Sequence, residues 1–350
     1  MRQGVFTPKL KLLWHSQRIL DWKNGKNISP IMVEFDLSNR CQLKCNFCTF
    51  RYMKDRSDIN TTIALKAITS MANMGVKSIN FTGGGEPTLH KDFDKILGQA
   101  FGYGIEVGLF TNGLFKEELI EPIVRKCSWA RVSLDAGNKE TFTKVKKIDA
   151  FEKVIENTRR LVDRRNYYGC DTTIGLGFVI SPDNYNDIEE VSDLAKDLGV
   201  DYLQYKPVID NMFDNTHTEA NWWKDEIEPR IERVMGENEK AVINLYKFND
   251  LVSNMDRDYK ECFGHQFCPC VGADGNVWIC THLREIDGYS MGNLYDTKYS
   301  FEGVWNGQKR QDAIKSIDLS KCQKYCRNNE INKVLYQLKY PNKGGHYNFL

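Results

Sequence analysis

The stretch DLSNRCQLKCNFCTFRYMK, residues 36–54, decides the fold of this chain. It carries Cys41, Cys45 and Cys48 in the spacing C-x3-C-x2-C, directly after a short apolar run. A structural zinc ion takes four ligands, usually with cysteines in C-x2-C pairs, and no fourth ligand lies nearby in the sequence. Three thiolates instead suit a 4Fe–4S cluster whose fourth iron stays open for a substrate or cosubstrate. The spacing therefore predicts an iron–sulfur centre that is one protein ligand short.

The composition is that of an ordinary globular protein with one large domain or two medium ones. Of 350 residues, 41% are hydrophobic and 27% are charged, and the formal net charge is +1. So small a net charge gives no strong signal for nucleic-acid binding. No apolar run reaches the roughly 18 residues of a membrane span, and residues 1–20 lack the features of a signal peptide. We therefore expect a cytoplasmic protein without a membrane partner, whose thiols are kept reduced.

The cysteines are clustered rather than scattered. Of the 11 cysteines, three lie in residues 41–48 and two, Cys127 and Cys170, stand alone. The other six are Cys262, Cys268, Cys270, Cys280, Cys322 and Cys326. In a reducing compartment such groups indicate metal binding or catalysis rather than disulfides. For the two isolated cysteines we expect buried core thiols.

Apolar patterns alternate between strand and helix from residue 31 to residue 209. Six strands are expected, at 31–38, 76–87, 106–113, 130–137, 172–180 and 201–209. Five helices are expected between them, at 63–75, 93–104, 116–127, 150–165 and 186–199. Such alternation predicts an α/β fold with a parallel sheet and right-handed crossovers. The pattern alone does not decide whether the sheet is open or curved into a barrel.

The chain divides into four expected parts: an N-terminal helical extension (1–30), a core domain (31–210), a helical connector (211–261) and a cysteine-rich module (262–350). The extension contains a basic amphipathic helix, for which packing on the domain edge is favoured over a membrane surface. The connector contains a charged helix with Trp222 and Trp223. In the module, Asp274–Gly275 is typical of the turn of a β-hairpin.

The core resembles the radical S-adenosylmethionine (radical SAM) superfamily from about Ile31 to Lys206. That superfamily has the same cysteine spacing with an aromatic residue before the last cysteine, here Phe47. The resemblance implies a partial (β/α)6 barrel of parallel strands. It also implies an enzyme that receives an electron from a reductant such as flavodoxin or ferredoxin. Reductive cleavage of SAM would then yield a 5′-deoxyadenosyl radical that abstracts hydrogen from the substrate.

The resemblance also assigns SAM-binding residues at the strand ends. The second strand ends in TGGGEP, in which Gly84, Gly85 and Glu86 would hold the methionine amino group. Glycines allow close backbone approach, and a carboxylate pairs with an ammonium group. The third strand ends in FTNG, which places Asn112 at the same rim.

Further assignments follow from the fourth and fifth strands. Ser133 and Asp135, two apart on an expected strand, would point to one face and bind the ribose. Lys146 stands where relatives often carry an arginine for the SAM carboxylate, although lysine lacks the bidentate fork. The segment around Gly177 and Ile180 resembles the one that packs on adenine. No residue is identified as the catalytic base or as a second hydrogen donor.

The six C-terminal cysteines resemble an auxiliary-cluster module of the SPASM or twitch type. Cys262, Gly275 and Cys280 follow the pattern C-x12-G-x4-C. One auxiliary 4Fe–4S cluster is expected, with Cys262, Cys280 and Cys326 as ligands. Three cysteines compete for the fourth place: Cys268, Cys270 and Cys322. Structural zinc is the alternative, which would hold the fold but could not carry electrons.

The substrate is the least determined part of the expected function. Only 40 residues precede Cys41, fewer than a leader-peptide-binding domain needs. We therefore expect a small polar substrate, such as a sugar, aminocyclitol or nucleotide, and an oxidation or rearrangement aided by the auxiliary cluster. A maturase of a ribosomally made peptide is the alternative. A non-catalytic Fe–S redox or sensor protein is a third interpretation, which the SAM-binding motifs argue against.

Overall fold

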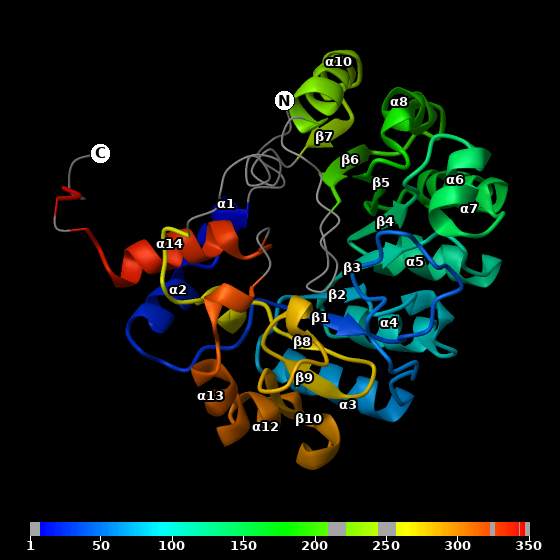
Figure 1. Cartoon of the computed structure of the whole chain (residues 1–350). Coiled ribbons are helices and arrows are strands. Elements are labelled where there is room, and N and C mark those ends of the chain that lie inside the picture. The colour runs from blue at the N-terminus through cyan, green and yellow to red at the C-terminus, as the bar shows by residue number, and fades with distance from the viewer. Residues whose placement is uncertain (1–7, 209–221, 244–256, 323–325, 343, 347–350) are drawn as a thin grey trace.

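The computed structural model describes residues 8–208, 222–243, 257–322, 326–342 and 344–346. Its centre is one 10-stranded sheet in the order β10-β9-β8-β1-β2-β3-β4-β5-β6-β7 (Figure 1). The strands are β1 (Met32–Asp36), β2 (Ser78–Thr82), β3 (Glu106–Thr111), β4 (Trp129–Ser133), β5 (Thr173–Ile180), β6 (Tyr202–Pro207), β7 (Ala241–Ile243), β8 (Cys270–Val271), β9 (Asn276–Trp278) and β10 (Ser290–Asn293). The core and the cysteine-rich end therefore share one continuous sheet.

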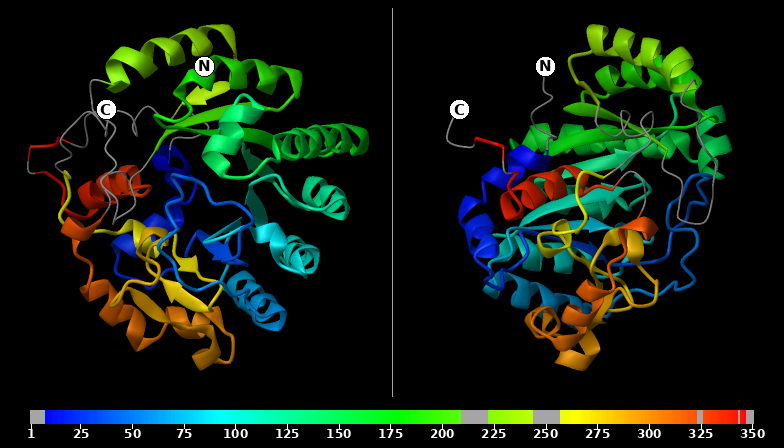
Figure 2. Two further views of the ribbon diagram at one scale, coloured as in Figure 1. Left: turned by 45° about the vertical axis from the view of Figure 1, so that its right-hand side comes forward. Right: turned by 60° about the vertical axis from the view of Figure 1, so that its left-hand side comes forward.

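The strands β1 to β6 are parallel and pair in chain order. Helices between them lie along the outer side of the curved sheet (Figure 2). They are α3 (Thr61–Asn73), α4 (Phe93–Gly102), α5 (Ile120–Lys126), α6 (Lys139–Lys146), α7 (Phe151–Tyr168) and α8 (Ile188–Asp197). The six strands and five helices expected from the sequence are all present. The alternation missed α6, whose eight residues bury only two apolar side chains, Phe142 and Val145.

Alternate strand residues face opposite sides of the sheet. In β3, Val107 and Leu109 are fully buried in the hydrophobic core beneath the helices. Phe110 lies on the inner side, where its ring centroid is 4.8 Å from that of Trp129 on β4. The outer side of the sheet therefore packs against the helices. A ligand can bind only on the inner side.

Large rings fill the amino-terminal part of the inner side. A Cβ atom at Gly108 would come within 2.2 Å of Trp129, and one at Gly175 within 2.2 Å of Tyr202. Only glycine fits at these two strand positions, because the neighbouring rings occupy the space. A ligand must therefore bind toward the carboxyl ends of the strands, the usual edge in parallel sheets.

The connector contributes a strand as well as helices. A single π-helical turn (η5, Trp223–Ile227) and α10 (Glu228–Glu237) precede β7. β7 pairs in parallel with β6, with Leu203 opposite Ala241. The expected helical connector at 211–261 therefore contains a strand as well. A strand of three residues is too short to show a period of two. Residues 211–221 and 244–256 lie outside the described residues.

The cysteine-rich module extends the opposite edge of the sheet. β8 pairs in parallel with β1, with Cys270 opposite Glu34, and forms an antiparallel hairpin with β9. The turn predicted at Asp274–Gly275 is present, and Gly275 has a φ of +79°, which glycine adopts without strain. The module's helices are α12 (Phe301–Trp305), α13 (Gln308–Lys315) and α14 (Asn329–Lys339). The module is thus attached to β1, the strand that leads into the three-cysteine loop.

The N-terminal helices α1 (Pro8–Leu13) and α2 (Ser16–Lys23) pack on this module. A second hydrophobic cluster joins them to it through Leu12, Ile19, Trp22, Ile28, Phe263, Phe267 and Leu335. The ring centroids of Trp22 and Phe263 are 5.1 Å apart. No helix among the described residues is both long and apolar enough to span a membrane.

The two isolated cysteines differ from each other. Cys127 is a buried core thiol, as expected, and ends α5. Cys170 is only half-buried, so the core expectation is wrong for it. It follows the C-terminal cap of α7 at Gly169, where the chain turns at the surface.

Candidate functional site

The three-cysteine loop follows β1 at the carboxyl edge of the sheet. Cys41 is exposed, whereas Cys45 and Cys48 are half-buried. Burial is the main cause that raises the pKa of Cys45, to about 11. Cys41 and Cys48 also raise the pKa of Cys45, which shows that the thiols lie near one another. Because the thiolate is the form that binds a metal, these thiols must release their protons when a cluster binds.

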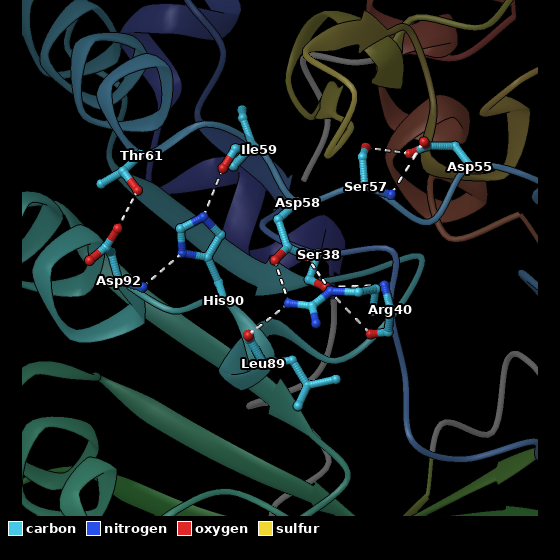
Figure 3. A network of polar contacts seen from close by, with 10 residues as sticks. All are labelled: Ser38, Arg40, Asp55, Ser57, Asp58, Ile59, Thr61, Leu89, His90 and Asp92. Carbon is cyan, nitrogen blue, oxygen red and sulfur yellow. Dashed lines mark hydrogen bonds and ion pairs between the residues drawn. The ribbon is translucent and has the colours of Figure 1, made fainter.

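A polar network fixes the base of this loop (Figure 3). Arg40, the residue before the first cysteine, forms a bidentate ion pair with Asp58. Its guanidinium also donates to the carbonyl of Leu89 at 3.2 Å, and its backbone N–H donates to Ser38 Oγ at 3.0 Å. The two ends of the loop are therefore tied to each other and to the segment that follows β2.

His90 continues the same network. Its Nε2 lies 2.7 Å from the carbonyl of Ile59, and its Nδ1 accepts from the backbone N–H of Asp92 at 3.1 Å. A carbonyl can only accept, so Nε2 carries the proton and the ring is neutral with one tautomer. Asp92 in turn accepts from Thr61 at the start of α3. Figure 3 shows this chain of contacts running from the loop to two helices.

The glycines after β2 pack against the cysteine loop. A Cβ atom at Gly84 would lie 2.3 Å from Asn39 Oδ1, and one at Gly85 would lie 2.1 Å from the carbonyl of Arg40. The backbone N–H of Glu86 donates to the same carbonyl at 2.8 Å. The glycines are thus needed for close contact between two loops of the site, and any role toward SAM adds to this packing.

Glu86 is buried and has four donors from the protein itself. Oε1 accepts from the Thr88 amide (3.2 Å), the Thr88 hydroxyl (2.6 Å) and the Thr111 hydroxyl (2.8 Å), while Oε2 accepts from the Asn112 amide at 2.7 Å. Burial raises the pKa of Glu86, although these bonds oppose the shift. The carboxylate thus joins the loops after β2 and β3, a role that the motif did not suggest. Its expected bond to the methionine amino group stays a prediction beside this structural role.

Glu86→Ala is therefore expected to destabilise the fold by about 3 kcal/mol, because it leaves several buried donors unpaired. Urea unfolding of the metal-free protein measures this directly. Glu118→Ala is the matched control, since the Glu118 side chain is 67% exposed and its nearest cation, on Lys116, is 3.6 Å away. A change below about 0.5 kcal/mol is expected there. Equal effects of the two substitutions would contradict the structural role of Glu86.

Asp135 and Lys146 form a buried ion pair, and both side chains are 2% exposed. Asp135 also accepts from the amide of Val179 at 2.6 Å. Burial alone would lower the pKa of Lys146, but Asp135 and then Cys45 raise it, and the net shift is upward. Asp135 was expected to bind the SAM ribose and Lys146 the SAM carboxylate. In the structure these two side chains bind each other. The ammonium of Lys146 lies 5.6 Å from the ring centroid of Phe47, so the ion pair packs against the cysteine loop.

The backbone explains why Asp135 is not beside Ser133. β4 ends at Ser133, and Asp135 has a φ of +58°, outside strand geometry. The alternation used to place both side chains on one face therefore stops before Asp135. Ser133 itself remains on the inner side, opposite Gly177 of β5.

Ile180 faces the wrong way for adenine. It is 1% exposed and belongs to the hydrophobic core on the outer side of the sheet. Its neighbour Val179 is half-buried and pairs with Lys206, so Val179 occupies the inner side instead. Asn112 does lie at the rim, where its Nδ2 donates to Gln42 Oε1 at 3.1 Å and lies 3.7 Å from Cys41 Sγ. Asn112 therefore orients the first cysteine of the loop.

Four of the six C-terminal cysteines form an electrostatic group. Burial first, then Cys326, Cys262 and Cys322, raise the pKa of Cys280. The pKa of Cys322 is raised to about 11 and that of Cys326 to about 12, again mainly by burial. These four thiols fit the donor set of a thiolate-bound cluster.

Cys268 and Cys270 lie outside this group of four cysteines. Cys268 is buried beside Cys280 and Cys270, so it borders the group of four. Cys270 is fully buried and its sulfur accepts from Arg284 Nε at 3.0 Å. Burial raises the pKa of Cys270 to about 12, although Arg284 opposes the shift. Among the competing cysteines, the structure therefore favours Cys322 and Cys268 over Cys270.

Sequence reasoning missed the charged residues that join the module to the core. Glu34 and Asp36 are buried on β1, and the arginines that meet them are Arg284 and Arg327. A signal was present, because carboxylates two apart within an apolar strand point to one face, and buried carboxylates need partners. The sequence did not indicate which arginines or lysines pair with Glu34 and Asp36.

Two family profiles match the chain. The one described as "Radical SAM superfamily" matches residues 36–201. The one described as "Iron-sulfur cluster-binding domain", named SPASM, matches residues 262–328. The first covers the three-cysteine loop and the strand ends, and the second covers all six C-terminal cysteines.

Among curated proteins, a probable GTP 3′,8-cyclase of Methanocaldococcus jannaschii is 26% identical over 278 residues, which cover 76% of this chain and 85% of that protein. A probable GTP 3′,8-cyclase of Saccharolobus islandicus is 29% identical over 178 residues. This match covers 49% of the chain and 54% of the relative, so the chain spans about half of that protein's length.

Solved structures share the fold at low sequence identity. SuiB of Streptococcus suis superposes with a TM-score of 0.66 at 15% identity, over 91% of this chain and 78% of SuiB. The protein anSMEcpe, solved with bound AdoMet, superposes with a TM-score of 0.60 at 19% identity, over 87% of this chain and 88% of its own. These likenesses show a common architecture across both the core and the module.

Proposed function

Because the chain belongs to the radical SAM superfamily and ends in a SPASM-type iron–sulfur module, we propose that it abstracts hydrogen from a small, polar, anionic substrate bound on the inner side of the sheet. When bound, the primary cluster would supply the electron for reductive cleavage of SAM. Cys41, Cys45 and Cys48 would hold this cluster. The auxiliary cluster would be held by Cys262, Cys280, Cys326 and one of Cys322 or Cys268.

The observation that carries the substrate class is a cationic layer around Phe110. The guanidinium of Arg131 lies 4.2 Å from the centroid of this ring, and the ammonium of Lys206 lies 5.8 Å from it. Arg131 also donates to Gln204. This layer lies above the Trp129 and Tyr202 rings, toward the carboxyl ends of the strands. An anionic group and a flat ring are the features that such a layer recognises.

Burial strengthens the attraction for an anion. Burial lowers the pKa of Arg131, because its positive charge is poorly solvated. An anionic substrate would relieve that cost by supplying a counter-charge in a low-dielectric site. The other residues of the site hold its shape: Glu86 joins two loops, and Arg40 ties down the cysteine loop.

The names of the curated relatives agree with a small anionic substrate, since they are probable cyclases of GTP. The structural neighbours include SuiB bound to a precursor peptide and anSMEcpe bound to peptides. Their identity to this chain is 20% or lower, so that likeness concerns the fold. A peptide maturase is therefore the competing assignment, and the following experiment separates the two.

The test uses the anaerobically reconstituted holoenzyme with SAM and a chemical reductant. GTP, other nucleotides, sugar phosphates and a set of peptides are each added, and 5′-deoxyadenosine is measured against the substrate-free rate. Stimulation by a small anionic compound supports the proposal, provided that a deuterated sample of the compound transfers deuterium to 5′-deoxyadenosine. Stimulation by peptides alone would establish the maturase instead. No cleavage of SAM under any condition would point to a redox or sensor protein.

Lys206→Met should raise the KM for the substrate roughly 10- to 100-fold, because it removes one charged partner of the anion. The kcat should change much less, because Lys206 is assigned to binding. Lys196→Met is the control, since that ammonium pairs with Asp193 at the surface of α8. Steady-state kinetics with the substrate found above measure both constants. An unchanged KM for Lys206→Met would place the anion elsewhere.

A further inference from the structure

Arg284 is a fully buried arginine at the junction of three parts of the site. It follows Cys280 by one short 3₁₀ turn, η7 (Thr281–Leu283). Its Nη2 donates to Asp36 Oδ1 at 2.8 Å, and its Nε donates to Cys270 Sγ at 3.0 Å. Its guanidinium lies 4.5 Å from the ring centroid of Phe50, two residues after the last cysteine of the primary loop. One side chain thus touches the core strand, the auxiliary module and the primary loop.

Backbone contacts strengthen the same junction. The hydroxyl of Tyr52 donates to the carbonyl of Arg284 at 3.2 Å. The next residue, Glu285, accepts from the amide of Lys54 at 3.1 Å. The primary loop therefore contacts the segment that follows Cys280.

Asp36 extends the junction to the glycine loop. It is the last residue of β1, is fully buried, accepts from Arg284 and lies opposite Thr82 of β2, the residue before the glycine loop. Burial alone would lower the pKa of Arg284, yet Asp36 and Cys270 raise it above its ordinary range, so the guanidinium stays charged. A permanent positive charge is thus held four residues after Cys280, and one carboxylate links it to the end of β1, beside the strand that leads into the glycine loop.

We propose that Arg284 is a positioning residue that couples the two cluster sites: its charge raises the reduction potential of the auxiliary cluster, and its grip on Asp36 holds the SAM-binding loop. A nearby positive charge favours the more negative, reduced state of a cluster. Asp36 acts with the opposite sign, because it places a negative charge in the same region. The inference does not depend on which substrate the enzyme takes.

The potential is measured on the holoenzyme by redox titration followed by electron paramagnetic resonance of the auxiliary cluster. Arg284→Met should lower the potential, Arg284→Lys should leave it near the wild-type value, and Asp36→Asn should raise it. Arg310→Met is the control: Arg310 is another buried arginine of the module, bound to Asn27 Oδ1 at 3.0 Å and the Trp305 carbonyl at 3.1 Å. It should leave the potential unchanged. A purely structural role for Arg284 would not give shifts of opposite sign for Arg284→Met and Asp36→Asn.

The second readout is SAM affinity, measured by equilibrium binding to the same holoenzymes without turnover. Arg284→Met should weaken binding roughly five- to tenfold, the usual scale of coupling between sites, whereas Arg310→Met should not. Wild-type potential and affinity in folded, iron-loaded Arg284→Met would overturn the proposal, as would equal shifts from Arg310→Met. If Arg284→Met does not fold, the isosteric Asp36→Asn decides: a raised potential supports the coupling, and an unchanged one refutes it.

Discussion

Replacing Cys41, Cys45 and Cys48 together with alanine is expected to remove about four irons per chain and to abolish reductive cleavage of SAM. The three thiols come from one loop at the carboxyl edge of β1, and Cys41 and Cys48 both contribute to raising the pKa of Cys45. The auxiliary cluster should remain, because its cysteines lie in residues 262–326. The loop is expected to supply every thiolate of its cluster, so no other cysteine should compensate for its loss.

Iron and sulfide analysis, paramagnetic resonance and chromatography of 5′-deoxyadenosine together measure this result. Cys170→Ala is the control, because this cysteine is half-buried at the end of α7 and distant in sequence from both groups. It should keep about eight irons, four for each cluster. A triple variant that still formed 5′-deoxyadenosine would show that the radical chemistry is based at another site.

Cys280→Ala is expected to lower the iron content from about eight to about four and to loosen the C-terminal module. Cys280 is the thiol whose pKa responds to Cys262, Cys322 and Cys326, so it lies among the other candidate ligands. An auxiliary cluster would tie the hairpin of β8 and β9 to the segment before α14, and closing that long connection stabilises the module. The core should still bind SAM, since its strands and loops are intact.

Cys270→Ala is the contrasting variant, because the Cys270 sulfur contacts Arg284 and is set apart from the group of four. It should keep about eight irons, four for each cluster. If the cluster only accepts electrons from the substrate, Cys280→Ala should still abstract hydrogen but fail to complete the product. One zinc per chain together with only four irons, in protein purified without oxygen, would show that the module is a structural zinc site.

Local patterns in the sequence were enough for the core of the fold. The spacing of Cys41, Cys45 and Cys48 after a strand, and the glycines at 83–85 after the next one, mark the carboxyl edge of the sheet. Strands β1 to β6 and helices α3, α4, α5, α7 and α8 were recovered because their apolar periods are long and regular. Short elements were not: β7 and α6 carry too few apolar positions to show a period.

Site residues were least predictable where a side chain could choose between partners. The motifs assigned Glu86, Asp135 and Lys146 to SAM binding. In the structure each of these charged side chains has a partner within the protein. The Asp135 assignment assumed that strand alternation continues, and the left-handed backbone at this residue ends it. Ile180 was misplaced by one residue, which in a strand reverses the face.

By itself, the sequence determined the alternating α/β core, the three-cysteine loop and the presence of a second cysteine set, because each depends on spacing within one short segment. Only the tertiary structure decided that β8 pairs with β1 and that Arg284 reaches Asp36. These contacts join residues hundreds of positions apart. A buried charge needs an opposite charge and a strand edge needs a neighbouring strand, and both partners come from distant segments of the chain. Such pairing leaves no periodic pattern in the local sequence.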